Sequence, residues 1–295
     1  MPDDQHSDGV AGGGRTLADR LAAAGVGDRA EPWAAWLQLR AAEGNRATVI
    51  DLYELVAAPR GLAAHELPPA ERLSLARQAM AQTWPGFATT ESSERPKVPL
   101  VVVGYDPAWP QTYERWRQVV TAALGPAVPG IEHVGSTSVP GLAAKPIVDI
   151  QVSVADISDE PRYVPQLQAV GLVLRSRDEL HRFFRPPAGQ RRDVHVHVCA
   201  AGGHWERDHL LFRDYLRAHP AACLRYAEAK RASLRRWSDD SWAYTEAKTG
   251  VVLDILEQAE EWAAATDWAP GGSGAEAAVS RSCSSGPRGR SRPST

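Results

Sequence analysis

Hydrophobic residues recur at helical spacing in the first and last parts of the chain. From Thr16 to about Trp84 the apolar positions fall three or four residues apart. The same spacing appears again in residues 207–264. Four helices are predicted in the first stretch: Thr16 can cap one of them, and a pair of prolines begins another, LPPAERLSLARQAM. This pattern predicts a small all-α module at the start and a helical end.

The part between these stretches alternates between strand and helix signals. Strands are expected in VPLVVVGYDP, at Ile131–Val134, and in KPIVDIQVSV, LHRFFRP and DVHVHVCA. Helices are expected in QTYERWRQVVTAALG, which follows Pro110, and in PRYVPQLQAVG. Interleaved strands and helices predict an α+β (α/β-like) fold in which a mixed β-sheet is backed by helices.

Composition marks the boundaries between these parts. Both ends of the chain are rich in Gly, Ser, Pro and Arg. They cannot bury enough apolar surface to offset the conformational entropy that folding would cost. Between the two folded parts, ATTESSERPKVP is typical of a linker. The predicted division is a disordered tail (1–15), a helical module of unknown role (16–87), a linker (88–97), an α+β domain (98–268) and a disordered basic tail (269–295).

Composition and charge narrow the class of protein. Hydrophobic residues make up 43% of the chain and charged residues 23%, as in folded proteins, and the net charge of −3 disfavours a generally basic nucleic-acid-binding protein. No apolar run approaches the roughly 18 residues that suggest a membrane span, and no secretion signal is visible. Three cysteines without paired spacing indicate a reducing compartment. We therefore expect a cytoplasmic protein without a membrane partner, whose helical module packs or binds a protein.

The most informative stretch, residues 131–154, begins with a strand and a Gly-Ser loop. Gly135 permits a positive φ and a close approach of the backbone, and the amides of Ser136 and Thr137 then face outward. Such amides bind phosphate when a helical turn follows. Ordinary turns use the same residues, so the loop alone leaves a phosphate site and a plain turn open.

Asp149 stands out in the strand that follows. Alternation along KPIVDIQVSV places Val148 and Ile150 on one face and Asp149 and Gln151 on the other. A carboxylate among β-branched neighbours is costly unless it is paired, exposed or bound to a cation. Near a phosphate loop, Asp149 suits Mg²⁺ coordination, and an edge-strand aspartate that faces water is the alternative.

Two histidines share one face of a later strand. In DVHVHV the same alternation directs His195 and His197 to one side, where they can converge on one ligand or metal. With His133 they would form a three-histidine cluster, which is the basis of a His-metal hydrolase hypothesis. Histidines on strands also hydrogen-bond their neighbours, and that simpler interpretation stays open.

Several segments together carry a family resemblance. The string EHVGSTSVPGLAAKPIVDI resembles the signature of the GrpB family, a predicted nucleotidyltransferase group of the polymerase-β-type superfamily. YDPAWPQTYERWR precedes this string, and RFF, VHVHVC, HLLFRDYLRAHP, YAEAKR and YTEAKTGVVLDIL follow it in the same order. The resemblance covers roughly residues 98–264 and implies a nucleotidyltransferase fold for them.

The resemblance also implies roles for single residues. Members of the superfamily carry a Gly-Ser loop, two acids on the next strand and a third acid on a later strand, and these acids hold two Mg²⁺. Gly135 and Ser136 match the loop, and Asp149 matches the first acid. Gln151 stands where the second acid belongs, and a histidine of DVHVHV stands near the place of the third.

This departure changes the expected metal site. A single carboxylate with an amide can bind one metal but is a poor anchor for two dications, and histidines shift the preference toward Mn²⁺ or Zn²⁺. The expected cofactor is Mg²⁺, with Mn²⁺ as the alternative. The candidate metal ligands are Asp149, Gln151, His195 and His197, and the candidate catalytic residues are Asp149, Gln151 and His197.

Cationic residues near this stretch are candidates for phosphate binding. Lys145 lies four residues before Asp149, and Arg182 is one of six arginines between residues 175 and 192. Tyr244 and Lys248 occupy positions that the family pattern shares. With the loop residues, the candidate phosphate-binding set is Gly135, Ser136, Thr137, Lys145, Arg182, Tyr244 and Lys248, and solvated side chains are the alternative for the charged members.

The leading hypothesis for the function is a GrpB-like nucleotidyltransferase. It would bind a nucleoside triphosphate with a divalent metal and transfer a nucleotidyl group to a small-molecule or protein acceptor. The near-neutral charge makes a long nucleic acid a less favoured acceptor. A non-catalytic nucleotide-binding or adaptor protein that lost the second acid, as Gln151 suggests, is the alternative, and the His-metal hydrolase is a second.

Overall fold

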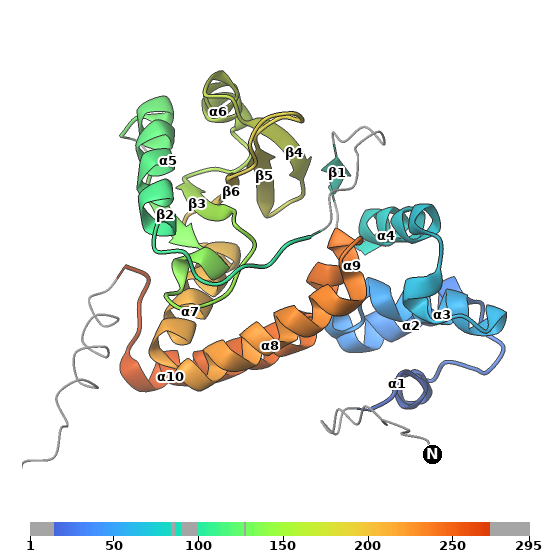
Figure 1. Cartoon of the computed structure of the whole chain (residues 1–295). Helices are drawn as coiled ribbons and strands as arrows, with labels where there is room; N and C mark the ends of the chain where they lie inside the picture. Colours follow the sequence, from blue (N-terminus) through green and yellow to red (C-terminus); the bar gives the residue numbers. More distant parts are fainter. Residues whose placement is uncertain (1–14, 84–85, 90–99, 127, 272–295) are drawn as a thin grey trace, which may run out of the picture. The chain divides into compact units, whose positions relative to one another are not determined.

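The computed structural model describes residues 15–83, 86–89, 100–126 and 128–271 (Figure 1). The chain divides into two compact units between Pro68 and Pro69. Most of the two predicted tails and residues 90–97 of the predicted linker lie outside the described residues.

The first unit is helical, as its apolar spacing predicts. Thr16 caps the first helix, because its hydroxyl accepts a hydrogen bond from the Asp19 amide at 3.2 Å. Arg20 then forms ion pairs with Glu43 and Asp51, both at 2.7 Å, which hold this helix against the next two. The described elements are α1 (Leu17–Ala23), α2 (Pro32–Glu43), η1 (Gly44–Arg46), α3 (Val49–Ala57), η2 (Ala58–Arg60) and η3 (Ala64–Glu66).

The fourth predicted helix, α4 (Pro69–Thr83), begins at the proline pair but falls in the second unit. Its Arg72 is only 2% exposed and pairs with Asp239 at 2.6 Å. The Arg72 guanidinium also lies over the ring of Trp237, 5.6 Å from its centroid. These partners are more than 160 residues away along the chain, so helical spacing alone could not assign α4 to this unit.

A mixed six-stranded sheet forms the centre of the described part of the second unit. The strand order is β1-β4-β5-β6-β3-β2. Strands β3 and β6 are parallel, and the other neighbours are antiparallel. The strands are β1 (Ala88–Thr89), β2 (Gly130–Val134), β3 (Val148–Val154), β4 (Val173–Arg177), β5 (His181–Arg185) and β6 (Val194–Ala200). The α+β fold with a mixed sheet is therefore confirmed.

One face of the sheet packs against α5 (Trp109–Leu124), η5 (Glu160–Arg162) and α6 (Val164–Ala169). The even-numbered residues of β3, which alternation assigns to one face, are buried here with Val120 of α5 and Leu167 of α6. Phe184 of β5 joins the same core, with no exposed surface. The main hydrophobic core thus lies between these helices and the sheet.

The opposite face carries the odd-numbered residues of β3 and lies toward the C-terminal helices. From this face, the hydroxyl of Ser153 on β3 donates a hydrogen bond to the carboxylate of Glu206 on α7. The helices share a second core with Val139 and Leu142, which follow the short helix η4 (Ser136–Ser138). They are α7 (His204–Ala218), α8 (Pro220–Trp237), α9 (Ser241–Glu246) and α10 (Thr249–Thr266). None of the helices in the described ranges is long and apolar enough to cross a membrane.

Two local predictions differ from the structure. The described residues of VPLVVVGYDP form an isolated bridge rather than a strand: Val103 exchanges two backbone hydrogen bonds of 2.9 Å with Ala144. Conversely, β4 is a strand that the sequence does not single out, because three of the five residues in its stretch VLRSR are polar or charged.

Candidate functional site

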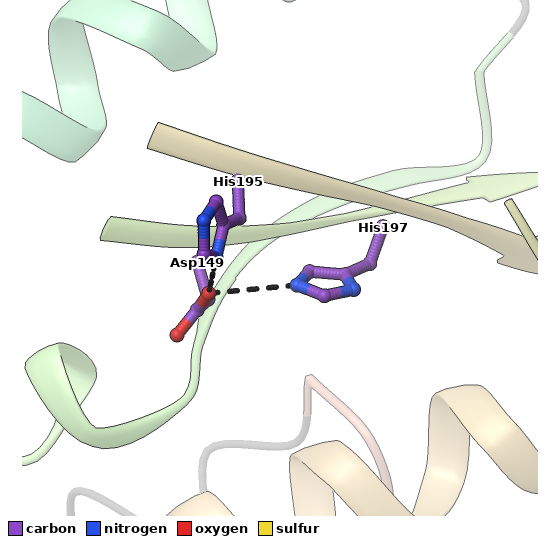
Figure 2. A group of neighbouring side chains, drawn as sticks. All are labelled: Asp149, His195 and His197. Atoms are coloured by element: carbon purple, nitrogen blue, oxygen red, sulfur yellow. Dashed lines mark hydrogen bonds and ion pairs between the residues drawn. The ribbon is translucent and has the colours of Figure 1, made fainter. Parts of the chain in front are cut away.

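Strands β3 and β6 place the three strongest candidate ligands side by side. Asp149 is the register partner of His195, and Gln151 is the partner of His197, so all four project from the same face of the sheet. His195 Nδ1 lies 3.1 Å and His197 Nε2 lies 3.5 Å from the same Asp149 oxygen, Oδ1. Figure 2 shows both imidazoles directed at this carboxylate.

The convergence is tight enough for one metal ion. One ligand atom each from Asp149, His195 and His197 lies within 4.8 Å of the other two. Their side chains are between 15% and 28% exposed, so solvent reaches the group. One carboxylate with two imidazoles is a donor set that divalent transition metals accept.

Arg192 determines which nitrogen of His195 carries the proton. Its Nε donates to His195 Nε2 at 3.0 Å, and a guanidinium can only donate. His195 therefore carries its proton on Nδ1 and donates it to Asp149. Burial lowers the pKa of His195 to about 4, although its hydrogen bond to Asp149 opposes the shift, so the ring is neutral at pH 7.

The carboxylate of Asp149 is held ionised. Burial alone would favour its protonated form, but the hydrogen bonds from His195 and His197 outweigh that effect and hold the pKa of Asp149 below its usual range. The site therefore presents an ionised carboxylate and the neutral imidazole of His195, and a metal that bound His195 Nδ1 would displace the proton on that nitrogen.

A third histidine, His181 of β5, extends this group. Its Nε2 lies 2.9 Å from His197 Nδ1, and its ring stacks on Trp205 of α7 with 4.8 Å between centroids. Phe183, two residues along β5, lies beside His197 with 5.3 Å between their centroids. The sequence analysis missed His181 and Trp205, although the alternation of β5 places His181 and Phe183 on one face.

His133 lies elsewhere, which removes the three-histidine cluster. Its register partner is Ile150, whose side chain belongs to the core beneath α5, and its ring stacks on Tyr113 of α5 at 4.7 Å between centroids. Because neighbours across two strands point to the same face, His133 lies on the opposite face from Asp149. The hydrolase hypothesis loses one of its three proposed ligands.

The loop after β2 touches the metal-ligand group through its glycine. Gly135 has φ +69°, and a Cβ there would overlap Oδ2 of Asp149. The side chain of Ser136 interacts with Tyr226 of α8, which opposes the effect of burial on the pKa of the Tyr226 phenol. Thr137 turns away, because its hydroxyl lies 3.0 Å from His133 Nε2 on the other face. Gly135 and Ser136 thus lie at the candidate site, whereas the Thr137 side chain does not.

Gln151 is the least satisfied of the candidates. Its side chain is fully buried, and neither its amide oxygen nor its amide nitrogen has a hydrogen-bond partner among the described residues. A buried polar group normally finds a partner, because leaving one unpaired costs about 1–3 kcal/mol. The free oxygen is therefore available to a ligand on the face that Asp149 shares.

Lysines gather beside this group. The ammonium groups of Lys145 and Lys248 lie over the ring of Tyr244, at 4.0 Å and 4.1 Å from its centroid. Burial lowers the pKa of Lys145 to about 8, and attraction to Asp149 opposes the shift. Lys145, Tyr244 and Lys248, predicted separately, are thus brought together. Lys230 of α8, which the sequence analysis missed, also interacts electrostatically with Asp149.

Arg182 is the candidate that lies apart. It pairs with Glu160 of η5 at 2.6 Å and donates to the carbonyl of Asp178. Its neighbours along β5, His181 and Phe183, face the candidate site, so alternation turns Arg182 to the other side of the sheet.

Arginines of α7 hold the loop rather than a ligand. Arg213 donates to Glu132 at 2.7 Å and to the carbonyl of His133 at 3.1 Å. Arg217 donates twice to the carbonyl of Ser138, at 3.0 Å and 2.8 Å. These bonds fix β2 and η4 against α7, so they position the Gly135 loop.

Comparisons with known proteins place this site in a family. Over 155 residues the chain is 48% identical to a UPF0157 protein of Streptomyces coelicolor, covering 52% of this chain and 81% of that protein. A dephospho-CoA kinase of Mycolicibacterium paratuberculosis is 29% identical over 229 residues, covering 68% of this chain and 56% of the kinase.

A solved structure and a family model also match part of this chain. The crystal structure of conserved protein GrpB from Enterococcus faecalis is 30% identical, covers 55% of this chain and 99% of its own, and has a TM-score of 0.49. Residues 99–258, which include every candidate ligand described above, match the family described as GrpB protein. The chain therefore belongs to the GrpB family.

Proposed function

We propose that this protein binds a nucleoside triphosphate with one divalent metal and transfers a nucleotidyl group to a small-molecule or protein acceptor. The observation that carries the proposal is the convergence of His195 and His197 on one oxygen of Asp149, beside the loop of Gly135. A metal-binding group supports the proposal because a divalent cation can polarise a phosphoryl oxygen, and the loop amides beside it can bind phosphate.

The donor set favours a single transition metal over a pair of Mg²⁺. Asp149 supplies the one carboxylate, His195 and His197 supply imidazoles, and Gln151 offers an unpaired amide oxygen. Mg²⁺ prefers oxygen ligands, whereas imidazole suits softer metals, so Mn²⁺ is the better candidate than Mg²⁺. Bound there, a divalent cation would polarise a phosphoryl oxygen of the substrate.

The remaining residues support binding of the phosphates. Lys145 and Lys248 supply positive charge from one side of Asp149. Gly135 lets the backbone lie against the carboxylate, where any side chain would intrude.

Cys199 and Cys223 are free thiols, which supports the cytoplasm as the place of this reaction.

Metal binding is the first test. Protein stripped with EDTA is titrated with MnCl₂ by calorimetry, and the Asp149→Asn variant is expected to bind at least about tenfold more weakly, because it loses the only anionic ligand. Asp156→Asn makes the same chemical change at an exposed turn after β3 and serves as the control. Equal affinities of wild type and Asp149→Asn would disprove the metal site.

Catalysis is the second test. The protein is incubated with Mn²⁺, each of the four α-labelled nucleoside triphosphates, and a cell extract as the source of acceptors. Transfer of label by wild type but not by Asp149→Asn is expected. Binding of nucleotide and metal without transfer would instead support the non-catalytic alternative, which the replacement of an acid by Gln151 favours.

A further inference from the structure

Lysine is rare in this chain, and most of it is in one place. The chain has 29 arginines but only four lysines, Lys97, Lys145, Lys230 and Lys248. Lys97 lies outside the described residues. The other three come from the segment before β3, from α8 and from the start of α10. Lys248 interacts electrostatically with the other two, and all three interact with Asp149. We call these three residues the lysine cluster.

Two tyrosines form the walls of the lysine cluster. Lys145 and Lys248 share the ring of Tyr244, and Lys230 lies over the ring of Tyr226, 4.8 Å from its centroid. Tyr226 interacts with Ser136, so the cluster lies beside the Gly135 loop. A ring face attracts a cation, but less strongly than an anion does.

The lysine cluster lacks anionic partners. Lys248 is 8% exposed, and the ammonium groups of Lys145 and Lys248 form no hydrogen bond or ion pair with any described residue. Lys230, which is 2% exposed, donates to the carbonyl of Ala143. The nearby carboxylate of Asp149 is already bonded to two histidines. Buried charges are normally paired, so three cations without a dedicated anion indicate a site that a ligand completes.

We propose that the lysine cluster binds a chain of at least two linked phosphoryl groups, and that it does so without a metal. When all three are protonated, as a bound anion would favour, the ammonium groups exceed the charge of Asp149 by two, which suits a diphosphate or triphosphate better than a single phosphate. Only the identification of this chain as the phosphates of a nucleotide rests on the function proposed above.

The choice of lysine supports this proposal. An ammonium is a compact charge on a flexible stem that can follow a phosphate chain, whereas a guanidinium needs a planar, bidentate partner. Burial, together with repulsion from Lys145 and Lys230, lowers the pKa of Lys248 to about 7. The crowded ammonium of Lys248 therefore holds its proton less tightly than an exposed lysine does, until an anion neutralises the neighbouring charges.

The test is calorimetry in EDTA with sodium orthophosphate, pyrophosphate and tripolyphosphate at low salt. Pyrophosphate and tripolyphosphate are expected to bind at least about tenfold more tightly than orthophosphate, because each added phosphoryl group gains charge-assisted hydrogen bonds. Failure of tripolyphosphate to bind, or equal affinity for all three anions, would overturn the proposal.

Variants separate the lysine cluster from general charge. Lys230→Met and Lys248→Met are expected to weaken tripolyphosphate binding by about tenfold or more, whereas Arg162→Met, which removes one charge from an 82% exposed side chain on η5, leaves it unchanged. Lys248→Met is also expected to melt at a higher temperature than wild type without ligand, because it removes an unpaired buried charge. A lower melting temperature would mean that Lys248 is structural, and the proposal would fail.

Asp149→Asn distinguishes this inference from the proposed function. Removing the carboxylate is expected to weaken Mn²⁺ binding at least about tenfold but to retain or tighten tripolyphosphate binding, because the lysine cluster then loses the Asp149 carboxylate, which competes with the anion. Anion binding in EDTA with no Mn²⁺ binding by wild type would refute the metal-dependent function and leave the lysine cluster standing. Mn²⁺ binding by wild type with no tripolyphosphate binding in EDTA would refute the lysine-cluster proposal alone and leave the metal-dependent function standing.

Discussion

Gly135 and Asp149 lie in contact, with no space for a side chain between them. A Cβ on Gly135 would overlap Oδ2 of Asp149 and lie 3.0 Å from the aspartate's Cβ and Cγ. Gly135 also has φ +69°, a conformation that favours glycine. The loop therefore needs glycine for two independent reasons, and its shape is coupled to the position of the carboxylate.

Gly135→Ala is expected to destabilise the protein and to weaken Mn²⁺ binding together. The positive φ and the overlap with Asp149 should lower the free energy of unfolding by about 2 kcal/mol or more, and the displaced carboxylate should bind metal less well. Chemical denaturation and calorimetry measure the two effects. Gly141→Ala is the matched control, because Gly141 has φ +80° but an added Cβ there would meet open space. It should lose about 1 kcal/mol of stability and keep its metal affinity.

Alternation along single strands predicted the centre of the site. It placed Asp149 and Gln151 on one face of β3 and His195 and His197 on one face of β6, and the parallel register of the two strands brings these faces together. It also separates Phe184, in the core, from Phe183, beside the histidines. The period-two pattern predicts these faces correctly because the face on which a side chain lies depends only on its position along its own strand.

Contacts between distant helices could not be predicted in this way. Helical spacing identifies α8 but does not show that its Lys230 lies near Lys248, at the start of α10. For the same reason the sequence groups α4 with the first three helices, although Arg72 reaches Asp239. His133 was misplaced beside the other histidines because the antiparallel register of β2 with β3, which turns it toward Tyr113, is not visible in its own strand.

Arg192 is expected to compete with a metal for His195. Its hydrogen bond to Nε2 keeps the proton on Nδ1, so metal binding through Nδ1 requires that proton to leave and Arg192 to move. Arg192→Gln should therefore bind Mn²⁺ about tenfold more tightly than wild type in calorimetry. Arg191→Gln changes the adjacent, 87% exposed side chain and should have no effect. Unchanged or weaker binding by Arg192→Gln would exclude this competition.

Histidine burial should make the protein less stable in mild acid. Burial lowers the pKa of His133 to about 4, against 6.5 in an exposed histidine. Between these pH values the unfolded chain binds a proton that the folded chain does not, so the free energy of unfolding falls as the pH falls. His133→Gln should reduce the slope of stability against pH in this range by up to about 1.4 kcal/mol per pH unit. Urea denaturation at pH 4.5 to 7 measures the slope, and an unaltered slope would contradict the assignment.

Gln151 is expected to favour ligand binding at the expense of stability. Its buried amide has no hydrogen-bond partner among the described residues, so Gln151→Met, which keeps the shape without the polar atoms, should raise the free energy of unfolding by about 1 kcal/mol. If the amide oxygen is a metal ligand, the same variant should bind Mn²⁺ about tenfold more weakly. Gln168→Met makes the same change at an exposed position of α6 and should alter neither quantity. A Gln151→Met protein that is more stable and binds Mn²⁺ as wild type does would show that Gln151 is not a ligand, and the metal would then rest on Asp149 and the two histidines alone.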